Sequence, residues 1–364
     1  MIKMGLKDFF TRSSTRAPTK GVIVGRLFGN TLLPTGVLSA SNAMTNSDIY
    51  SVVSLISSDV ASMQFTASDK NVLKILQTPH KFINSFNFWQ SVVAQMLLYG
   101  NAYVTINKTP DGQQALGLEL LQDYQVSSVI VGDGSTDITY DVKYDDGRPE
   151  MYYGSDEMLH FKLVTVGSDE SNRYFGTSPL VSLAPELTIQ QLSNTLTKTT
   201  LKNGINPSVA IKIPEAQVDK EAKDFIRDGF VDSTTGDNAG KPIVLDASAD
   251  LQMLGISPEV TSFLENVNWT KNQISKAFGI NEAMLNGDGD SQSSIEMVQA
   301  QYQKSLMRYK NAIQYELALK MANDVNLAAV PTDDIILTRM EELVDKQIIS
   351  PVVANQTLKQ KGII

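Results

Sequence analysis

The 364-residue sequence contains no cysteine and only two histidines, His80 and His160. The absence of cysteine excludes disulfides, thiolate zinc sites and cysteine nucleophiles. The histidines are far apart in the sequence, and neither belongs to an HExxH pattern. We therefore expect neither a metal site nor a bound cofactor.

The sequence also lacks long hydrophobic segments. It has no run of 18 apolar residues, which predicts that no helix spans a membrane. The first residues, MIKMGLKDFFTRSS, are not continuously apolar, so we predict no signal peptide. Hydrophobic residues make up 42% and charged residues 20%, the composition of an ordinary globular protein. The length predicts roughly two domains of about 150 residues each.

Basic residues are fewer than acidic ones, 31 against 40, so the formal net charge is −9. A protein that binds DNA tightly through its phosphates needs a basic surface, and the overall balance does not supply one. Basic residues gather at the start, where residues 1–30 carry six lysines and arginines against Asp8. This arm is either a solvated terminus or a segment that docks on an acidic partner. Residues 110–161 have the opposite sign, with eleven acids against two bases, an acidic surface that favours solubility.

Catalytic motifs are missing as well. The segment from Gly236 to Lys241 resembles a phosphate-binding loop, but its glycine spacing is one residue short and Pro242 replaces serine or threonine. Residues 288–299 begin like a calcium loop but lack the required glycine and final glutamate. GxSxG and GxGxxG are absent. The sequence therefore indicates no catalytic residues and a protein that is not an enzyme.

The first half of the chain predicts mixed helices and strands. Apolar residues at helical spacing predict a helix over 47–63, capped by Asn46 or Ser47, and a second over 87–99, with Gly100 after its end. Short segments rich in Tyr, Val and Ile between turn residues predict strands. The expected strands are 102–107, 115–121, 126–131, 139–144 and 157–164.

The second half predicts mainly helices. Ser178-Pro179 opens a helical region that breaks at Pro185, and a helix over 185–203 follows with a thin apolar stripe. Such a stripe suits a helix that packs against like neighbours or faces a wet lumen. A compact insert comes next, and long helices and a polar loop complete the chain. The insert comprises a strand (208–213), a helix (219–231), a loop (232–241) and two strands (242–246, 250–254); the later elements are a helix (258–278), a loop (279–292) and helices over 293–323, 331–347 and 350–362.

Several motifs, taken in order, resemble those of the portal proteins of tailed bacteriophages. The most specific is the unit from Leu98 to Tyr103, which matches the family's helix–GNAY–strand step. Leu159-His160 and the segment from Gly176 to Leu180 match its "H … G-x-S-P" step. The segment from Ala277 to Ile280 matches the FG-V-P step, although Asn281 replaces proline. The other matching segments are 73–79, where His80 replaces the usual asparagine; 88–89; and 341–343 with 350–351, where the NE-x-R step is absent.

The resemblance implies an α+β portal-type fold in a ring of twelve subunits around an axial DNA channel. The expected parts are a basic N-terminal arm (1–45), an α/β wing (46–178), stem helix 1 (179–204), a small α/β clip (205–257), stem helix 2 (258–278), a tunnel loop (279–293), a long wing helix (294–330) and a short helical crown (331–364). Acidic and small polar channel walls keep the duplex from sticking, which accounts for the acidic composition.

The resemblance also implies partners and sites. It predicts a virion component at one capsid vertex, assembled in the host cytoplasm, that packages DNA with a terminase that hydrolyses ATP and joins a head–tail adaptor. The expected capsid contact is the major capsid protein, with a scaffold protein as a further candidate partner. No membrane is involved. The tunnel-loop residues facing DNA would be Glu282, Met284, Leu285, Asn286, Asp288 and Asp290. The clip docking loop would contain Thr234, Gly236, Asp237, Asn238 and Gly240.

Two other interpretations remain open at this point. One is another phage structural protein, such as a connector or a baseplate component, which needs no stem–insert–stem arrangement. The other is a hydrolase whose metal is held by scattered carboxylates, although no spacing in the sequence points to it.

Overall fold

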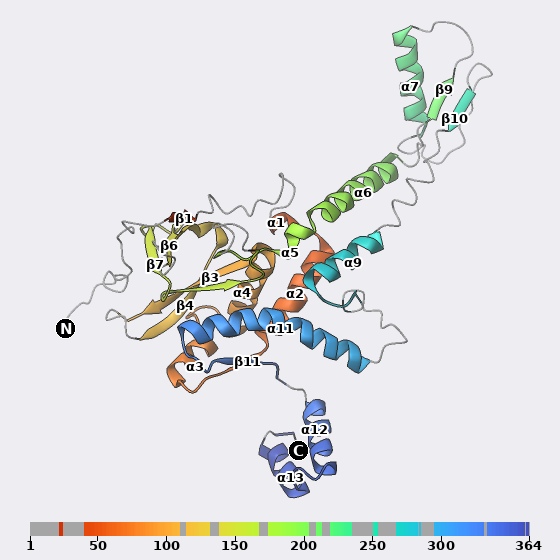
Figure 1. The fold of residues 1–364 in the computed structure, drawn as a ribbon. Coiled ribbons are helices and arrows are strands. Elements are labelled where there is room, and N and C mark those ends of the chain that lie inside the picture. Colours follow the sequence, from red (N-terminus) through yellow and green to blue (C-terminus); the bar gives the residue numbers. More distant parts are fainter. Residues whose placement is uncertain are drawn as a thin grey trace, which may run out of the picture. The chain divides into compact units, whose positions relative to one another are not determined.

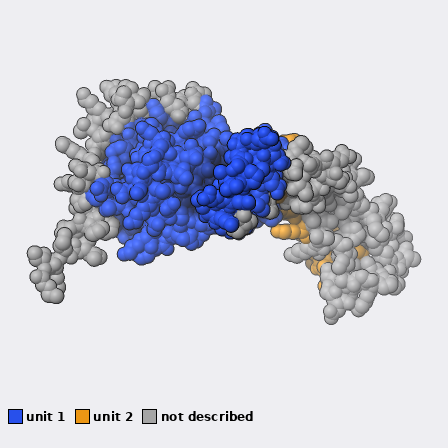
Figure 2. Space-filling model, turned by 90° about the horizontal axis from the view of Figure 1, so that it is seen from below, with its two compact units in different colours: residues 1–181, 288–364 blue, residues 182–287 orange. Residues whose placement is uncertain are grey.

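The computed structural model of the protein describes residues 22–24, 40–109, 114–131, 138–166, 174–203, 209–212, 219–234, 250–253, 267–282, 284, 295–330, 333–360 and 362–363. The chain divides into two compact units, which Figure 2 distinguishes by colour. Unit 1 combines residues 1–181 with 288–364, and unit 2 comprises 182–287. In sequence, therefore, unit 2 is an insertion within unit 1.

Two antiparallel sheets form the centre of unit 1 (Figure 1). The first has the order β4-β3-β8 and the second the order β1-β5-β6-β7. The strands of the first sheet are β3 (Asn101–Lys108), β4 (Ala115–Leu121) and β8 (Met158–Lys162). Those of the second are β1 (Val22–Val24), β5 (Val126–Val131), β6 (Ile138–Val142) and β7 (Met151–Gly154).

The side chains of β3 and β8 alternate between two buried faces. On one face Tyr103 packs with Tyr140 of β6, with ring centroids 6.1 Å apart, within a core that both sheets share. On the other face Phe161 packs edge-on to Trp89, a residue of the helix α4 (Ser85–Tyr99), at 6.2 Å. Unit 1 therefore has three layers: helices, the sheet β4-β3-β8, and the sheet β1-β5-β6-β7.

The helix layer forms where the sequence supplies both caps and apolar faces. Asn46 caps α2 (Ser47–Ala61) by accepting hydrogen bonds from the backbone of Asp48 and Ile49. Asp69 caps α3 (Lys70–Gln77), and Asn84 caps α4. Gly100 ends α4 in the left-handed region, with φ at 80°.

The two sequence segments of unit 1 are joined by several elements. The 26-residue helix α11 (Ile295–Lys320), about 39 Å long, contacts α2 and β8. The short strand β2 (Gln64–Thr66) pairs with β11 (Asn326–Ala328). The remaining helices of this unit are α1 (Ala40–Ala43), α12 (Asp333–Asp345) and α13 (Pro351–Gln360).

Unit 2 contains α6 (Ala184–Asn203), β9 (Val209–Lys212), α7 (Lys220–Thr234), β10 (Asp250–Met253) and α9 (Val267–Phe278). Helices α6 and α9 contact each other, and β9 pairs antiparallel with β10. The short helix α5 (Pro179–Ser182) precedes α6 and breaks at Leu183, two residues before Pro185. The predicted interruption of the helical region is thus confirmed.

Most predicted elements of unit 1 are confirmed within one or two residues, and 115–121 and 126–131 match β4 and β5 at both ends. The helix predicted from 87 begins two residues earlier, because Asn84 is the capping residue. The strand predicted over 139–144 is β6, which ends at Val142. Residues 22–24, assigned to the basic arm, form β1 and pair with β5. The remainder of 1–39 lies outside the described residues.

Two predicted loops are partly helical. Asp232–Thr234, predicted as the start of a loop, form the last residues of α7. Glu282 and Met284, predicted within a loop, adopt helical geometry, and the Met284 N–H donates to the Asn281 carbonyl at 3.0 Å. The predicted strand 242–246 and the first part of the helix predicted over 258–278 lie outside the described residues. No helix in the described part of the chain is long and apolar enough to cross a membrane.

Candidate functional site

The two helices of unit 2 that contact each other bury polar side chains as well as apolar ones such as Leu187 and Ile274. Ser193 of α6 and Thr270 and Ser275 of α9 are each at most 7% exposed. Two apolar side chains of α6 point outward instead, since Ile189 is 36% and Leu192 is 63% exposed. This matches the thin apolar stripe in the sequence and leaves Leu192 uncovered within a single chain.

The C-terminal end of α9 is closed by a glycine motif. The Gly279 N–H donates to the Lys276 carbonyl at 3.0 Å, and the Ile280 N–H donates to the Ser275 carbonyl at 2.9 Å. Gly279 has φ at 65°, so this is the paired hydrogen-bond pattern that commonly terminates helices, with Ile280 buried behind it. The glycine of the Phe278-Gly279 pair therefore serves to end α9 in the left-handed conformation.

Of the six predicted tunnel-loop residues, the structure describes two. Glu282 accepts a hydrogen bond from the Asn272 side chain of α9 at 3.0 Å, which ties its carboxylate to that helix. Met284 lies in the following helical turn and is partly buried. Leu285, Asn286, Asp288 and Asp290 lie outside the described residues.

Of the five predicted clip-loop residues, only Thr234 is described. It is the last residue of α7, so it belongs to a helix and not to a loop. Gly236, Asp237, Asn238 and Gly240 lie outside the described residues. On α7 itself Phe225 is 80% exposed, and Arg227 pairs with Asp224 and Asp228 at 2.8 Å each.

A buried polar network in unit 1 lies just before the start of unit 2. The Asn101 side chain accepts hydrogen bonds from the Gly176 N–H at 2.8 Å and from His160 Nε2 at 3.0 Å. Its amide nitrogen donates to the Gly176 carbonyl at 2.9 Å. Asn101 and His160 are at most 2% exposed. A single asparagine therefore binds both the N–H and the carbonyl of Gly176, in the segment that leads into α5.

The ring of His160 has a defined tautomer in this network. The Asn101 oxygen cannot donate, so His160 Nε2 carries the proton. The other nitrogen, Nδ1, then accepts from the Tyr140 hydroxyl at 3.2 Å. Burial, with a smaller contribution from Glu316, raises the pKa of Tyr140 and keeps its hydroxyl protonated as a donor.

Two glycines make the close approach in this network possible. A Cβ on Gly100 would lie 2.5 Å from the Gly176 carbonyl oxygen, and one on Gly176 would lie 2.1 Å from the Gly100 carbonyl oxygen. Neither site therefore accepts a side chain. Ser178 completes the junction, because its hydroxyl donates to the Leu97 carbonyl at 3.0 Å and accepts from the Leu180 N–H at 3.1 Å. The GNAY, His and G-x-S-P residues thus form one site.

A second anchor fixes α11 to the outer edge of β8. The His160 N–H donates to the Glu316 carboxylate at 2.9 Å, and Lys320 Nζ donates to the Met158 carbonyl at 2.6 Å. Glu316 and Lys320 also form an ion pair at 2.6 Å, with both side chains 13% exposed. An ion pair one helical turn apart therefore occupies the edge groups of this strand, which would otherwise be open to another strand. In the sequence, only the i,i+4 spacing of Glu316 and Lys320 points to this contact.

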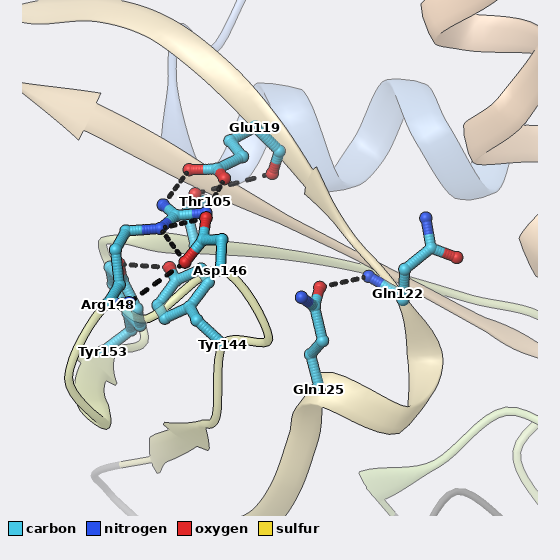
Figure 3. Close-up of polar contacts among 8 residues, drawn as sticks. All are labelled: Thr105, Glu119, Gln122, Gln125, Tyr144, Asp146, Arg148 and Tyr153. Carbon is cyan, nitrogen blue, oxygen red and sulfur yellow. Dashed lines mark hydrogen bonds and ion pairs between the residues drawn. The ribbon is translucent and has the colours of Figure 1, made fainter.

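A third cluster fastens the two sheets of unit 1 to each other (Figure 3). The Arg148 guanidinium forms a bidentate pair with Glu119 of β4, at 2.6 and 3.0 Å, and its Nε binds Asp146 at 2.8 Å. The guanidinium also lies 3.7 Å from the centre of the Tyr144 ring. Hydrogen bonding to Arg148 lowers the pKa of Asp146. Asp146 also accepts a hydrogen bond from the Arg148 backbone N–H at 3.1 Å, so its carboxylate stabilises the turn.

His80, the residue that departs from the resembled motif, has a clear role. Its Nδ1 accepts a hydrogen bond from the Phe82 N–H at 3.2 Å, the position that an asparagine oxygen occupies in an Asx turn. The replacement therefore preserves the turn by supplying a different acceptor.

None of these clusters resembles a catalytic or metal centre. Among the residues that the structure describes, no group of three His, Cys, Asp or Glu side chains could hold a metal ion. Their hydrogen bonds fix the backbone around Gly176 against the end of α4 and the start of β3. They define a structural scaffold in unit 1 that is held together by buried polar contacts.

The family follows from comparison with known proteins. A model described as "Phage portal protein" matches residues 47–350, and the chain belongs to this family, which is structural and not enzymatic. The portal protein of Enterobacteria phage HK97 is 18% identical over 337 residues, covering 85% of this chain and 76% of that protein. An uncharacterized protein of Rickettsia bellii is 25% identical over 226 residues, which cover 60% of this chain and 56% of the relative.

Solved structures show the same fold. A chain from the neck of a native gene transfer agent particle, computed with C12 symmetry, has a TM-score of 0.63 at 21% identity, covering 93% of this chain and 96% of that one. An HK97-family portal protein from Corynebacterium diphtheriae has a TM-score of 0.60 at 16% identity, covering 81% of this chain and 99% of that one. The α+β fold of the protein is thus that of portal proteins.

Proposed function

We propose that the protein is a portal subunit, twelve copies of which form a closed ring around a channel for double-stranded DNA at one vertex of a capsid. In this role it packages the genome with a terminase, joins a head–tail adaptor and releases DNA on ejection. Family membership over residues 47–350 supports the proposal. The symmetric neck particle among the structural neighbours supports a ring within a virion.

The observation that carries the proposal is the polar helix pair α6 and α9. In the proposal these are the stem helices, and 205–257 is the clip between them. A helix pair that exposes Leu192 of α6 while it buries Ser193 of α6 and Thr270 of α9 is poorly suited to an isolated monomer. It suits a ring, in which neighbouring copies cover the exposed apolar side chains and polar walls do not bind phosphates.

The proposed tunnel loop comprises residues 279–293 and faces the DNA. From Ala277 to Gln303 the sequence contains four acids and no lysine or arginine. Negative charge there repels the phosphates, while Met284 and Leu285 contact the duplex sterically. The closure of α9 at Gly279 and the Asn272–Glu282 hydrogen bond would set the direction in which this segment leaves the helix.

The proposed docking segment of the clip comprises Thr234 at the end of α7 and, after it, Gly236, Asp237, Asn238 and Gly240. It would bind the terminase during packaging and the adaptor afterwards, and contacts with the major capsid protein and a scaffold protein would involve other parts of the ring. Because loops supported by a scaffold often carry contacts, replacing 235–240 with glycine and serine should leave ring assembly intact and weaken packaging or tail joining. Normal efficiency in both steps would show that the docking surface lies elsewhere.

Ring formation is the direct test of the proposed function. Native mass spectrometry of the purified protein should show a complex of about 480 kDa, twelve times the 39.9 kDa chain. Electron microscopy of the same sample should show a central hole. A protein that stays monomeric or dimeric at all concentrations would contradict the proposal.

A further inference from the structure

The segment from α3 through the connection to the first turn of α4 exposes three large apolar side chains and contains three exposed lysines. Phe82 is 84% exposed, Ile83 43% and Phe86 40%, all within five residues. We call this surface the basic apolar patch; its members are Lys70, Lys74, Lys81, Phe82, Ile83 and Phe86. Three neighbouring exposed apolar side chains of this size mark an interaction surface more often than chance exposure does.

Local contacts hold this connection in a fixed conformation. Phe82 is fixed by its hydrogen bond to His80, and Lys81 Nζ lies 5.4 Å from the centre of the Phe82 ring. The Pro79 carbonyl accepts from the Leu118 N–H of β4 at 2.7 Å, which anchors the connection to the central sheet. Because its backbone is anchored, the connection presents Phe82 outward as a preformed contact.

The patch also carries uncompensated positive charge. Lys70, Lys74 and Lys81 are exposed, and none of them forms an ion pair with another described residue. Asp69, the nearest acid in sequence, is engaged in capping α3. The patch therefore fits a partner surface that offers both carboxylates and apolar or aromatic area.

A surface of that kind lies elsewhere in unit 1. The connection between β6 and β7 exposes Asp145 and Glu150, and Tyr124 beside it is 58% exposed and donates to Asp145 at 2.6 Å. We call this the acidic aromatic surface. Asp145 makes no ion pair among the described residues, whereas Glu150 pairs weakly with Lys143 at 3.4 Å. The surface is acidic and presents an aromatic ring.

The two surfaces adjoin β4 in different ways. The connection that carries the patch is bound where the Leu118 N–H donates to the Pro79 carbonyl, whereas the β6–β7 connection that carries Asp145 is bound where Arg148 pairs with the Glu119 side chain. A closed ring requires two different, complementary surfaces on each subunit, and these two meet that condition. A two-fold contact of the patch with itself would instead bring lysines together.

We infer that the basic apolar patch of one copy binds the acidic aromatic surface of the next copy, and that this contact closes the ring. The inference rests on the proposed function, because it names the surfaces by which the subunits meet. Lysines pair with Asp145 at the rim, while Phe82 and Phe86 are buried against Tyr124. A phosphate backbone would neutralise the lysines but leave both phenylalanines exposed, so DNA fits the patch less well.

Charge reversal within one chain tests the contact. Lys70→Glu/Lys81→Glu and, separately, Asp145→Lys should each raise the protein concentration for half-maximal ring assembly at least about tenfold. The combined variant should return to within about threefold of the wild type, because the pairs are restored with reversed sign. Phe82→Ser should weaken assembly and should not be rescued by Asp145→Lys. Assembly is followed by native mass spectrometry.

The controls separate the possible outcomes. Lys359→Glu, an exposed lysine outside the patch, should assemble as the wild type does, and circular dichroism should show every variant folded. If the wild type forms rings and all patch variants assemble equally well, this inference is overturned and the proposed function is left intact. Rings that form normally but fail to enter capsids would identify the capsid as the occupant and overturn it too. A monomeric wild type would overturn both.

Discussion

At the scale of single residues, backbone conformation makes the sharpest demands. Gln347, which ends α12, has φ at 55°, the only non-glycine residue with positive φ in the described part of the chain. Its N–H donates to the Val344 carbonyl and the Ile348 N–H donates to the Leu343 carbonyl, the pattern that Gly279 and Gly362 also form. A side chain at this position strains the backbone by about 1 kcal/mol.

Gln347→Gly should therefore stabilise the α12–α13 segment by about 0.5 to 1 kcal/mol, measured as slower amide hydrogen exchange in α12. The matched variant is Gly362→Ala, at φ of 69°, where an added Cβ meets no atom within 4 Å. It should destabilise the end of α13 by a similar amount through backbone strain alone. Equal exchange rates in all three proteins would show that the left-handed positions are not strained.

The same scale shows what the sequence could and could not predict. The caps at Asn46 and Gly100 were recognisable because each residue type meets a local need. The buried network was not, because Asn101, His160 and Gly176 meet only through the pairing of β3 with β8. The resemblance pointed to these residues without supplying their contacts. The predicted Asp288 and Asp290 remain predictions, since they lie outside the described residues.

At the scale of elements, the length of a helix or strand and the sequence separation of its partner determine whether it can be predicted. Strands β4 and β5 have six or seven residues with clear turn signals, and both were predicted. Strands β1, β2 and β11 have three residues each and exist because a strand distant in the sequence pairs with them. Strand β7 has four residues and pairs with the preceding strand, β6. No helix is predicted over α3, because its eight residues make only about two turns, too few to show a clear helical period. The shortest strands therefore depend on tertiary pairing, which a local sequence pattern does not reveal.

The anchor between α11 and β8 gives a prediction at this scale. Lys320→Met leaves the Glu316 carboxylate largely buried with only a backbone donor, and should lower the free energy of unfolding of unit 1 by about 2 to 3 kcal/mol. Glu316→Gln/Lys320→Met should cost less than the sum of the single changes, because neither charge remains. Denaturant unfolding measures both.

The chain offers a matched control for this pair. Lys346 and Glu342 of α12 have the same i,i+4 spacing, but they lie 3.8 Å apart and are 67% and 62% exposed. Lys346→Met should change stability by less than about 0.5 kcal/mol. Equal losses for the two lysine variants would show that the strand-edge contacts of Lys320 add nothing.

At the scale of the whole molecule, the proposed channel predicts an effect of charge on packaging. Asp288→Lys/Asp290→Lys should create phosphate contacts and reduce the DNA packaged per head, more strongly at low salt than at moderate salt. Glu341→Lys/Asp345→Lys makes the same charge change at exposed positions of α12 and should leave packaging unchanged. Unaltered packaging at both salts in the first variant would place residues 279–293 away from the DNA path.

The insertion of unit 2 within the sequence of unit 1 has a consequence for the continuity of the chain. The strand β2 pairs with β11, the Tyr302 hydroxyl donates to Asp59, and Glu316 binds the backbone of β8, so each sequence segment of unit 1 depends on the other. The two sequence segments therefore form one shared core, although unit 2 separates them in the sequence. Fragments 1–240 and 241–364, expressed together, should associate and co-purify, whereas each alone should be insoluble. A single protease cut between them should release no piece until the core of unit 1 unfolds.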